Sequence, residues 1–104
     1  MQCEIYVIKT EIIGNKAQIE ALEKIKDEIS LKIGGITVLP IIQGEWFENG
    51  KKYVDNGEIW RICASNDKPI DFIWLNQKIV EIKALTLQKS QLMTASPKTS
   101  AYFF

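Results

Sequence analysis

Hydrophobic and polar residues alternate at the start of the chain, and this pattern predicts a β-strand over residues 2–9. One face of this strand carries Cys3, Ile5 and Val7. The other face starts with Glu4 and becomes hydrophobic toward its end. We therefore expect the first face to be buried and the second to be partly covered.

The period changes after residue 15, where hydrophobic residues recur at steps of three and four. This spacing is typical of an amphipathic helix. The residues are Ile19, Leu22, Ile25, Ile29 and Ile33. Asn15 is the predicted N-cap, with Gln18 completing a variant of the capping box. Gly34 is the predicted end of the helix, because glycine adopts the left-handed conformation without a Cβ penalty.

A long β-hairpin follows, with strands over residues 36–47 and 51–64. Asn49-Gly50 between them is the strongest hairpin-turn signal of the chain. Pro40 lacks a backbone N–H donor and predicts that the first strand lies at a sheet edge or carries a bulge there. Residues 55–57, Asp-Asn-Gly, predict an interruption of the second strand by a turn or bulge.

A second helix is predicted over residues 69–87, with Asp67 as N-cap and Pro69 in the first turn. Its hydrophobic residues form two stripes, one of which contains Ile73, Val80, Ala84 and Leu87. Such a wide apolar arc predicts either deep burial or a surface for a partner. Short strands are expected over residues 90–95 and 101–104.

The order of these elements is β-α-β-β-α-β, which predicts an α+β domain of ferredoxin-like fold spanning residues 1–104. In that fold the antiparallel sheet has the strand order 4-1-3-2 and both helices pack on one face. The terminal segment adds a short extra strand. Pro40 on the edge strand agrees with this order.

A sheet that is covered on one side exposes its other face. A monomer seldom exposes so large an apolar patch. We therefore expect a homo-oligomer, a dimer formed through the open sheet face. The alternative is a monomer in which residues 102–104 fold over this face.

Charge and cysteine content indicate which partners and which cellular compartment to expect. Thirteen basic and thirteen acidic residues cancel, so the chain has no broad field to attract nucleic acid or anionic lipid. It has no secretory signal pattern and no apolar run of about 20 residues, so we expect no membrane partner and a cytoplasmic location. Cys3 and Cys63 are then expected to be free, buried thiols.

The chain has no histidine, which removes the usual participant in zinc sites, Ser-His and Cys-His catalysis. No nucleotide-binding glycine motif or nucleophile elbow is present. The acidic residues near the hairpin match no calcium loop. We therefore predict no cofactor, no metal and no catalytic residue, which favours a protein that is not an enzyme.

Four residues near the hairpin are candidate ligand-binding residues: Arg61, Trp60, Trp46 and Glu45. The two tryptophans are predicted to pack across the strands, or to form a ligand platform. Arg61 is the only arginine and predicts an ion pair with Glu4, or with Glu45 and Glu58, or a contact with an anionic ligand.

Single-stranded RNA binding is a further hypothesis, because RNA-recognition domains share this topology and stack bases on aromatic residues of the central strands. Tyr6 and Trp60 would form that platform. The zero net charge and the lack of a Lys/Arg-Gly-Phe type run argue against it, and we expect no nucleic-acid partner.

The run Gly34-Gly35-Ile36-Thr37-Val38, the motif Gly44-x-Trp46, the Asn49-Gly50 turn, Glu58 and the ending Ala101-Tyr102-Phe103 carry a resemblance. The chain resembles a group of small uncharacterised bacterial and phage proteins of ferredoxin-like fold. The resemblance implies the fold and a dimer, and it carries over no activity. The chain is also similar in element order to signal-transducing PII-like and copper-tolerance-type trimers.

We therefore predict a non-catalytic, self-associating interaction or regulatory module. The alternative is a small-molecule-binding protein or a cofactor-free enzyme of the dimeric α/β-barrel type. Its pocket would lie near Trp46, Trp60 and Arg61.

Overall fold

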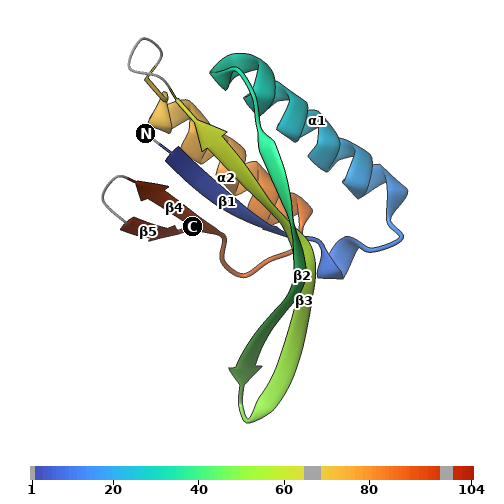
Figure 1. Cartoon of the computed structure of the whole chain (residues 1–104). Helices are drawn as coiled ribbons and strands as arrows, with labels where there is room; N and C mark the ends of the chain where they lie inside the picture. Colours follow the sequence, from blue (N-terminus) through green and yellow to red (C-terminus); the bar gives the residue numbers. More distant parts are fainter. Residues whose placement is uncertain (1, 65–68, 97–99) are drawn as a thin grey trace.

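The computed structural model describes residues 2–64, 69–96 and 100–104, with the backbone alone for residues 41–43, 96, 100, 101 and 103. Figure 1 shows two helices and a sheet with one long projecting hairpin. The elements in chain order are β1 (Gln2–Ile8), the 3-10 helix η1 (Thr10–Ile12), α1 (Lys16–Ile33), β2 (Thr37–Glu48), β3 (Lys51–Cys63), α2 (Phe72–Leu85), β4 (Leu92–Ser96) and β5 (Ser100–Phe103).

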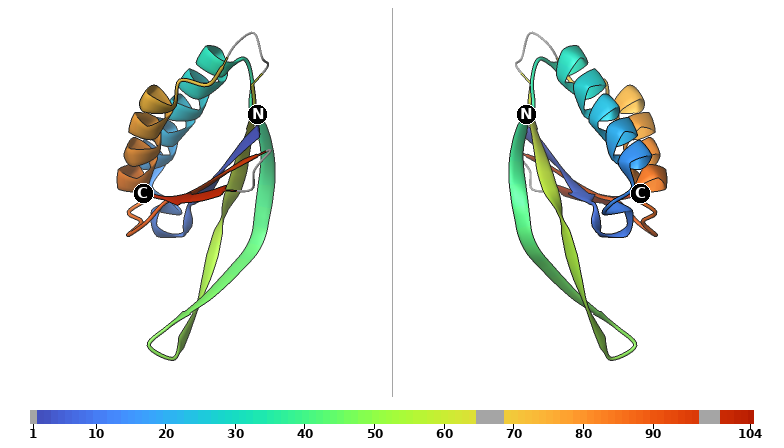
Figure 2. Two further views of the ribbon diagram at one scale, coloured as in Figure 1. Left: turned by 90° about the vertical axis from the view of Figure 1, so that its left-hand side faces the viewer. Right: turned by 90° about the vertical axis from the view of Figure 1, so that its right-hand side faces the viewer.

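The five strands form one sheet in the order β2-β3-β1-β4-β5, and each neighbouring pair is antiparallel. The predicted α+β class and the antiparallel sheet are therefore confirmed. β1 and β3 are interior, while the terminal residues form β5 beside β4 at the edge. Both helices cover the same face of the sheet, and the other face has no helix on it (Figure 2).

The ends of α1 follow the sequence signals. The Asn15 side chain accepts a hydrogen bond from the Gln18 backbone N–H at 3.2 Å, which confirms the predicted N-cap. Gly34 has φ 111° and its N–H donates to the Ser30 carbonyl at 2.8 Å. Because this backbone conformation favours glycine, the chain leaves the helix where the sequence predicted.

The start of α2 differs from the prediction. The helix begins at Phe72, and its N-cap is Asp71, whose carboxylate accepts a hydrogen bond from the Trp74 N–H at 3.1 Å. Pro69 lies before the helix, and the predicted cap Asp67 lies outside the described residues. Asp67 and Asp71 both precede this apolar stretch. A helix capped by Asp67 would need helical geometry in the residue directly before Pro69, which proline disfavours, so Asp71 is the cap.

The hairpin strands also differ in one respect. β2 lies at the sheet edge, as Pro40 predicted, and its pairing with β3 shifts register between Ile41 and Gly44. The prediction of a turn or bulge at residues 55–57 is confirmed in part: β3 runs without a turn from Lys51 to Cys63, but the register shift in its pairing with β2 lies at Asp55 and Gly57. Gly57 serves another purpose: a Cβ there would lie 2.0 Å from the Val7 carbonyl oxygen.

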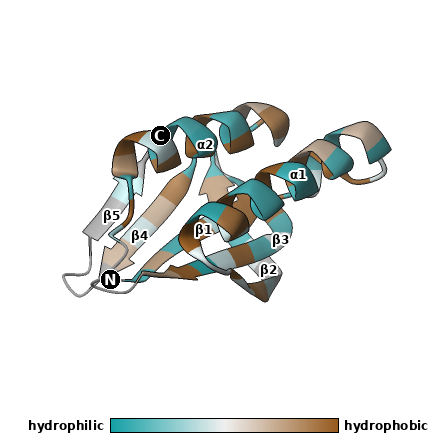
Figure 3. Ribbon diagram, turned by 90° about the horizontal axis from the view of Figure 1, so that it is seen from above, coloured by the Kyte–Doolittle hydropathy of each residue, from teal (hydrophilic) through white to brown (hydrophobic). Residues whose placement is uncertain are grey.

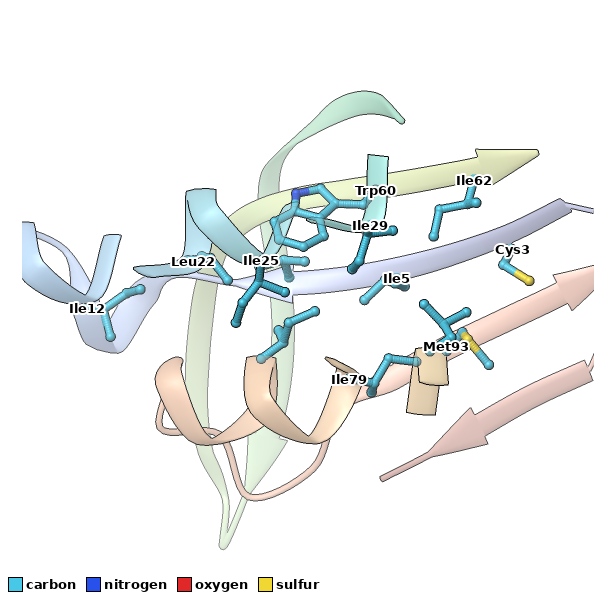
Figure 4. Close-up of a cluster of buried hydrophobic side chains, with 13 residues drawn as sticks. Cys3, Ile5, Ile12, Leu22, Ile25, Ile29, Trp60, Ile62, Ile79 and Met93 are labelled. Atoms are coloured by element: carbon cyan, nitrogen blue, oxygen red, sulfur yellow. The ribbon is translucent and has the colours of Figure 1, made fainter. Parts of the chain in front are cut away.

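The hydrophobic core lies between the helices and the covered sheet face. Figure 4 shows Trp60 of β3 among Ile25 and Ile29 of α1, with Ile5 of β1 and Ile79 of α2 nearby. The largest buried side chain is that of Trp60, which is 0% exposed. Burial of apolar surface at this scale is the main driving force of folding.

The C-terminus does not cover the open face. The backbone N–H and carbonyl of Gln91 pair with the carbonyl and N–H of Phe104, and Phe104 packs against the core. The alternative monomer with residues 102–104 over the open face is therefore wrong. No helix among the described residues is long and apolar enough to cross a membrane.

Candidate functional site

The outer part of the hairpin projects beyond the sheet, and we call residues 44–55 the arm (Figure 1). Its tip is the Asn49-Gly50 turn, where both residues have positive φ, 53° and 75°. This is the backbone of a tight hairpin turn, which asparagine and glycine adopt most readily. The predicted turn is therefore confirmed, and it sets the register of the arm.

One face of the arm carries an aromatic stack. Trp46 lies opposite Tyr53, with ring centroids 4.5 Å apart and planes at 16°. The Lys51 ammonium lies 5.4 Å from the Tyr53 ring centroid. Trp46 nevertheless remains 41% exposed. The stack thus holds the arm together locally and leaves a large aromatic surface uncovered.

The other face of the arm combines apolar and charged side chains. Phe47 is 70% exposed, and Val54 on the facing strand is exposed as well. Glu45 and Lys52 form an ion pair at 2.9 Å between them. An isolated two-stranded hairpin is at best marginally stable in water. An arm with large apolar residues on both faces is therefore a surface that a partner would stabilise.

The open face of the sheet lies beside the arm. On it, Arg61 of β3 lies opposite Glu4 of β1, and their Nη2 and Oε1 atoms are 3.7 Å apart. This pairing confirms the first of the two predicted alternatives for Arg61, the ion pair with Glu4. The neighbouring pair on the same face is Tyr6 and Ile59, both half-buried. The open face is thus a mixture of one ion pair and apolar side chains.

Arg61 has a donor without a partner. Its Nε atom is buried, and no group among the described residues accepts a hydrogen bond from it. A buried donor without an acceptor costs free energy, so an acceptor supplied by a ligand or a second copy would be favourable. Of the four candidates, only Arg61 has a buried polar atom that no group of the described residues satisfies.

A polar cluster lies on the covered face, where the arm leaves the body of the sheet. The Glu58 carboxylate accepts a hydrogen bond from Trp60 Nε1 at 2.8 Å and pairs with Lys9 Nζ at 2.9 Å. Burial raises the pKa of Glu58, but the hydrogen bonds from Trp60 and Lys9 and the charges of Lys9 and Lys26 outweigh it. Its pKa is therefore below its ordinary value of 4.5, and Glu58 is ionised at neutral pH.

A second set of bonds fixes the same end of the sheet. Thr10 Oγ1 accepts from the Asn56 N–H at 2.7 Å and donates to Asp55 Oδ1 at 3.3 Å. The Lys9 N–H donates to the Asn56 carbonyl at 2.7 Å. These bonds tie η1 to β3, so the root of the arm is anchored to the segment that follows β1.

The four predicted ligand residues do not meet in one copy of the chain. Trp60 is in the core, Arg61 is on the open face, and Trp46 and Glu45 lie on opposite faces of the arm. The predicted pairing of the two tryptophans is wrong: Trp46 lies opposite Tyr53, far along the hairpin from Trp60. Consecutive residues of a strand face opposite sides, which separates Trp60 from Arg61.

The predicted RNA platform is not formed either. Tyr6 lies opposite Ile59 on the open face, whereas Trp60 lies opposite Ile5 and points into the core. Two bases could not stack on these two rings from one side of the sheet.

The two cysteines are also separated by the sheet. Cys3 is buried, as predicted, but Cys63 is exposed, and both are free thiols. Burial raises the pKa of the Cys3 thiol, which favours its unreactive protonated form. Among the described residues, no group of three or more acidic, cysteine or histidine side chains lies close enough to hold a metal ion.

A small cavity of about 60 Å³ lies elsewhere, between the C-terminal end of α1 and the start of α2. Trp74, Lys32 and Asp71 contribute to its lining. Ligand pockets usually measure about 300–1,000 Å³. This cavity has room for solvent only, and Arg61, Trp60, Trp46 and Glu45 do not line it.

Sequence reasoning missed Lys9 and named Glu58 only as a possible partner of Arg61, not of Trp60. Their signal was the strand period, since Glu58 and Trp60 are two apart and must share a face. A carboxylate beside a buried tryptophan predicts a hydrogen bond to the indole N–H.

Comparison with known proteins gives one informative result. No family model and no curated protein matches the chain. A solved structure is similar, that of a phage SAM lyase in complex with S-methyl-5'-thioadenosine, with a TM-score of 0.66 and 13% identity. The match covers 99% of this chain and 87% of that chain. At this identity the likeness shows a shared fold.

Proposed function

We propose that this protein is a non-catalytic, self-associating interaction module of ferredoxin-like fold, in which a second copy covers the open sheet face and the arm. The observation that carries the proposal is the exposed apolar surface of the arm, above all Phe47 at 70% exposure. Exposed patches of this kind mark interaction sites in proteins. A cytoplasmic location belongs to the same proposal, and the free thiols suit a reducing compartment.

Charge supports a second copy as the partner. The chain carries no net charge, so two copies do not repel each other. Both surfaces also carry an ion pair next to apolar side chains, Glu45 with Lys52 on the arm and Glu4 with Arg61 on the open face. Such mixed surfaces can align opposite charges across an interface while apolar residues are buried.

Sedimentation velocity tests this proposal. We expect the wild type to sediment as an oligomer at micromolar concentration and Phe47→Glu to sediment closer to the 11.9 kDa monomer. Leu31→Glu is the matched control, because Leu31 is 86% exposed on α1, away from both surfaces. A monomeric wild type, or equal effects of the two variants, would refute self-association through the arm.

A second function is favoured by the structural likeness. The similar phage enzyme acts on SAM and was solved with S-methyl-5'-thioadenosine bound. We propose as the alternative that this chain binds such a sulfur-containing adenosine derivative between copies, against Arg61. The guanidinium of Arg61 is well suited to the carboxylate of SAM, which S-methyl-5'-thioadenosine lacks.

This alternative has a sharp test. Calorimetric titration with SAM and with S-methyl-5'-thioadenosine should show binding of both by the wild type. Arg61→Ala should weaken SAM binding about tenfold or more and leave S-methyl-5'-thioadenosine binding unchanged, because only SAM offers a carboxylate. Absence of heat with both compounds would exclude this alternative, while chromatography of the SAM reaction mixture would reveal any turnover.

A further inference from the structure

The outer surface of α2 carries a stripe of hydrophobic residues that no other part of the described chain covers. We define the outer stripe as Ile73, Val80 and Ala84, which are all exposed. Ile73 is 78% exposed and Val80 is 54% exposed. Figure 3 shows hydrophobic residues recurring along α2.

The outer stripe lies on the side of α2 that is opposite the core. The buried residues of this helix are Leu75, Ile79 and Ile82. At 100° per residue, the centre of this set lies about 140° around the helix from the centre of Ile73 and Val80. The buried residues already fill the core side of α2, so the outer stripe has no intramolecular role in the described chain.

The spacing of the outer stripe is that of a helix–helix seam. Ile73 and Val80 are seven residues apart, and Ala84 follows after four more. A seven-residue repeat keeps hydrophobic residues facing a second helix. Leu87, which is also exposed, follows just beyond the end of the helix.

The charges that flank the outer stripe differ in sign. On the helical wheel Glu81 lies on one side of the outer stripe and Lys83 on the other. Lys78 lies further around the helix from the outer stripe and pairs with Glu81 at 3.2 Å, yet the Glu81 side chain keeps 52% exposure.

Only one orientation of two identical helices brings these opposite charges together. In a parallel pair with a two-fold axis, the Glu81 side of each helix meets the Lys83 side of the other. In an antiparallel pair the Glu81 sides of the two helices lie on the same flank, so Glu81 does not meet Lys83 there. The flanks therefore favour a parallel arrangement.

We propose that the outer stripe binds α2 of a second copy of this chain in a parallel, two-fold pair. In that pair Ile73 meets Ile73, Val80 meets Val80, and Glu81 meets Lys83. This surface lies on the helix side of the molecule, away from the open sheet face (Figure 2). A copy can use both surfaces at once, so the pair links oligomers that form through the sheet.

The pair is short, and its size sets its strength. A helix of 14 residues is about 21 Å long, so the contact is smaller than a standard protein interface. The helix is already folded, however, and no ordering of the backbone opposes the contact. The association is therefore weak and depends on concentration.

Disulfide trapping tests the pair and its direction. In a Cys63→Ser background, which removes the exposed thiol, Ile73→Cys is oxidised with diamide. Two thiols then lose two protons and two electrons to diamide and form one disulfide between copies. We expect rapid formation of the covalent dimer by Ile73→Cys and slow formation by the matched control Leu31→Cys, exposed on α1.

Each outcome of the trapping experiment decides the proposal. A parallel pair predicts trapping at both Ile73→Cys and Val80→Cys. Trapping at Val80→Cys alone indicates an antiparallel pair and overturns the proposal, as does trapping no faster than that of Leu31→Cys.

Charge exchange provides an independent readout. We measure sedimentation in the Phe47→Glu background, so that association through the arm does not contribute. Lys83→Glu should weaken dimerisation about tenfold, because two carboxylates then face each other. Combining it with Glu81→Lys should restore dimerisation, and failure to restore it would overturn the parallel arrangement. Circular dichroism and thermal melting check that each variant folds.

Discussion

Trp60 and Trp46 belong to one hairpin, yet Trp60 is fully buried and Trp46 is 41% exposed. In the body of the sheet both helices lie on the face to which Trp60 points (Figure 2), and Trp60 packs in the core with its indole N–H donating to Glu58. In the arm the same two strands have nothing above or below them among the described residues. Trp46 has only the Tyr53 ring as a cover.

The inner half of the hairpin, in the body of the sheet, and the outer half, the arm, have different roles. The inner half contributes to the stability of the folded chain, because its side chains leave water on folding. The outer half buries little on folding and keeps its apolar surface for a partner. Substitutions in the two halves should therefore separate stability from association.

The largest effect is expected from removing the buried tryptophan. Trp60→Ala should lower the free energy of unfolding by about 3–5 kcal/mol, because it leaves a cavity in the core and removes the indole N–H that donates to the Glu58 carboxylate. Trp46→Ala should change it by less than about 1 kcal/mol. Urea unfolding measures both, and equal losses would show that the arm is as well packed as the body.

A smaller loss of stability is expected from a substitution that adds atoms where the arm joins the body of the sheet. Gly57→Ala should cost about 1–3 kcal/mol, because the added Cβ would lie 2.0 Å from the Val7 carbonyl oxygen and force β1 and β3 apart. Gly50→Ala at the arm tip meets no atom within 4 Å and faces only the strain of its φ of 75°. Thermal melting should show that Gly57→Ala is less stable than Gly50→Ala. The reverse ranking would mean that the β1 backbone moves away from the added Cβ at little cost.

The smallest effect should depend on pH. The folded pKa of Glu58 is lowered, so its stabilising contribution is present above the ordinary glutamate pKa of 4.5 and is lost as the pH falls through the folded value. Glu58→Gln should cost about 1 kcal/mol at pH 7 and nothing in acid. Unfolding curves over this pH range measure the difference, with the exposed Glu11→Gln as control. If Glu58→Gln lowered the free energy of unfolding equally at all pH values, the charge of Glu58 would not contribute to stability.

Local signals in the chain predicted much of the secondary structure. The cap at Asn15, the stop at Gly34 and the turn at Asn49-Gly50 each depend on contacts within a few residues, and all three are confirmed. The start of α2 was wrong because two aspartates compete for the cap within five residues. Of the turn or bulge predicted at residues 55–57, only an irregular pairing with β2 is present, and the close approach of Gly57 to the carbonyl of a neighbouring strand is one that no local pattern shows.

The candidate site was harder to predict. Arg61 with Glu4 was among the expected pairs, since strand register alone brings them opposite each other. The predicted grouping of Trp46, Trp60 and Arg61 was wrong, because it depends on which face of each strand is covered. Lys9 was missed because the turn at η1 brings it to β3.

The sequence by itself determined the hairpin and its two tryptophans, because alternation, turn residues and caps act over short distances along the chain. Only the tertiary structure decided that Trp60 is core and Trp46 is surface. The two helices that cover Trp60 come from segments far away in the sequence, and they end before the arm begins (Figure 1). Burial is a property of how such segments meet, and identical local patterns therefore reach opposite outcomes on one hairpin.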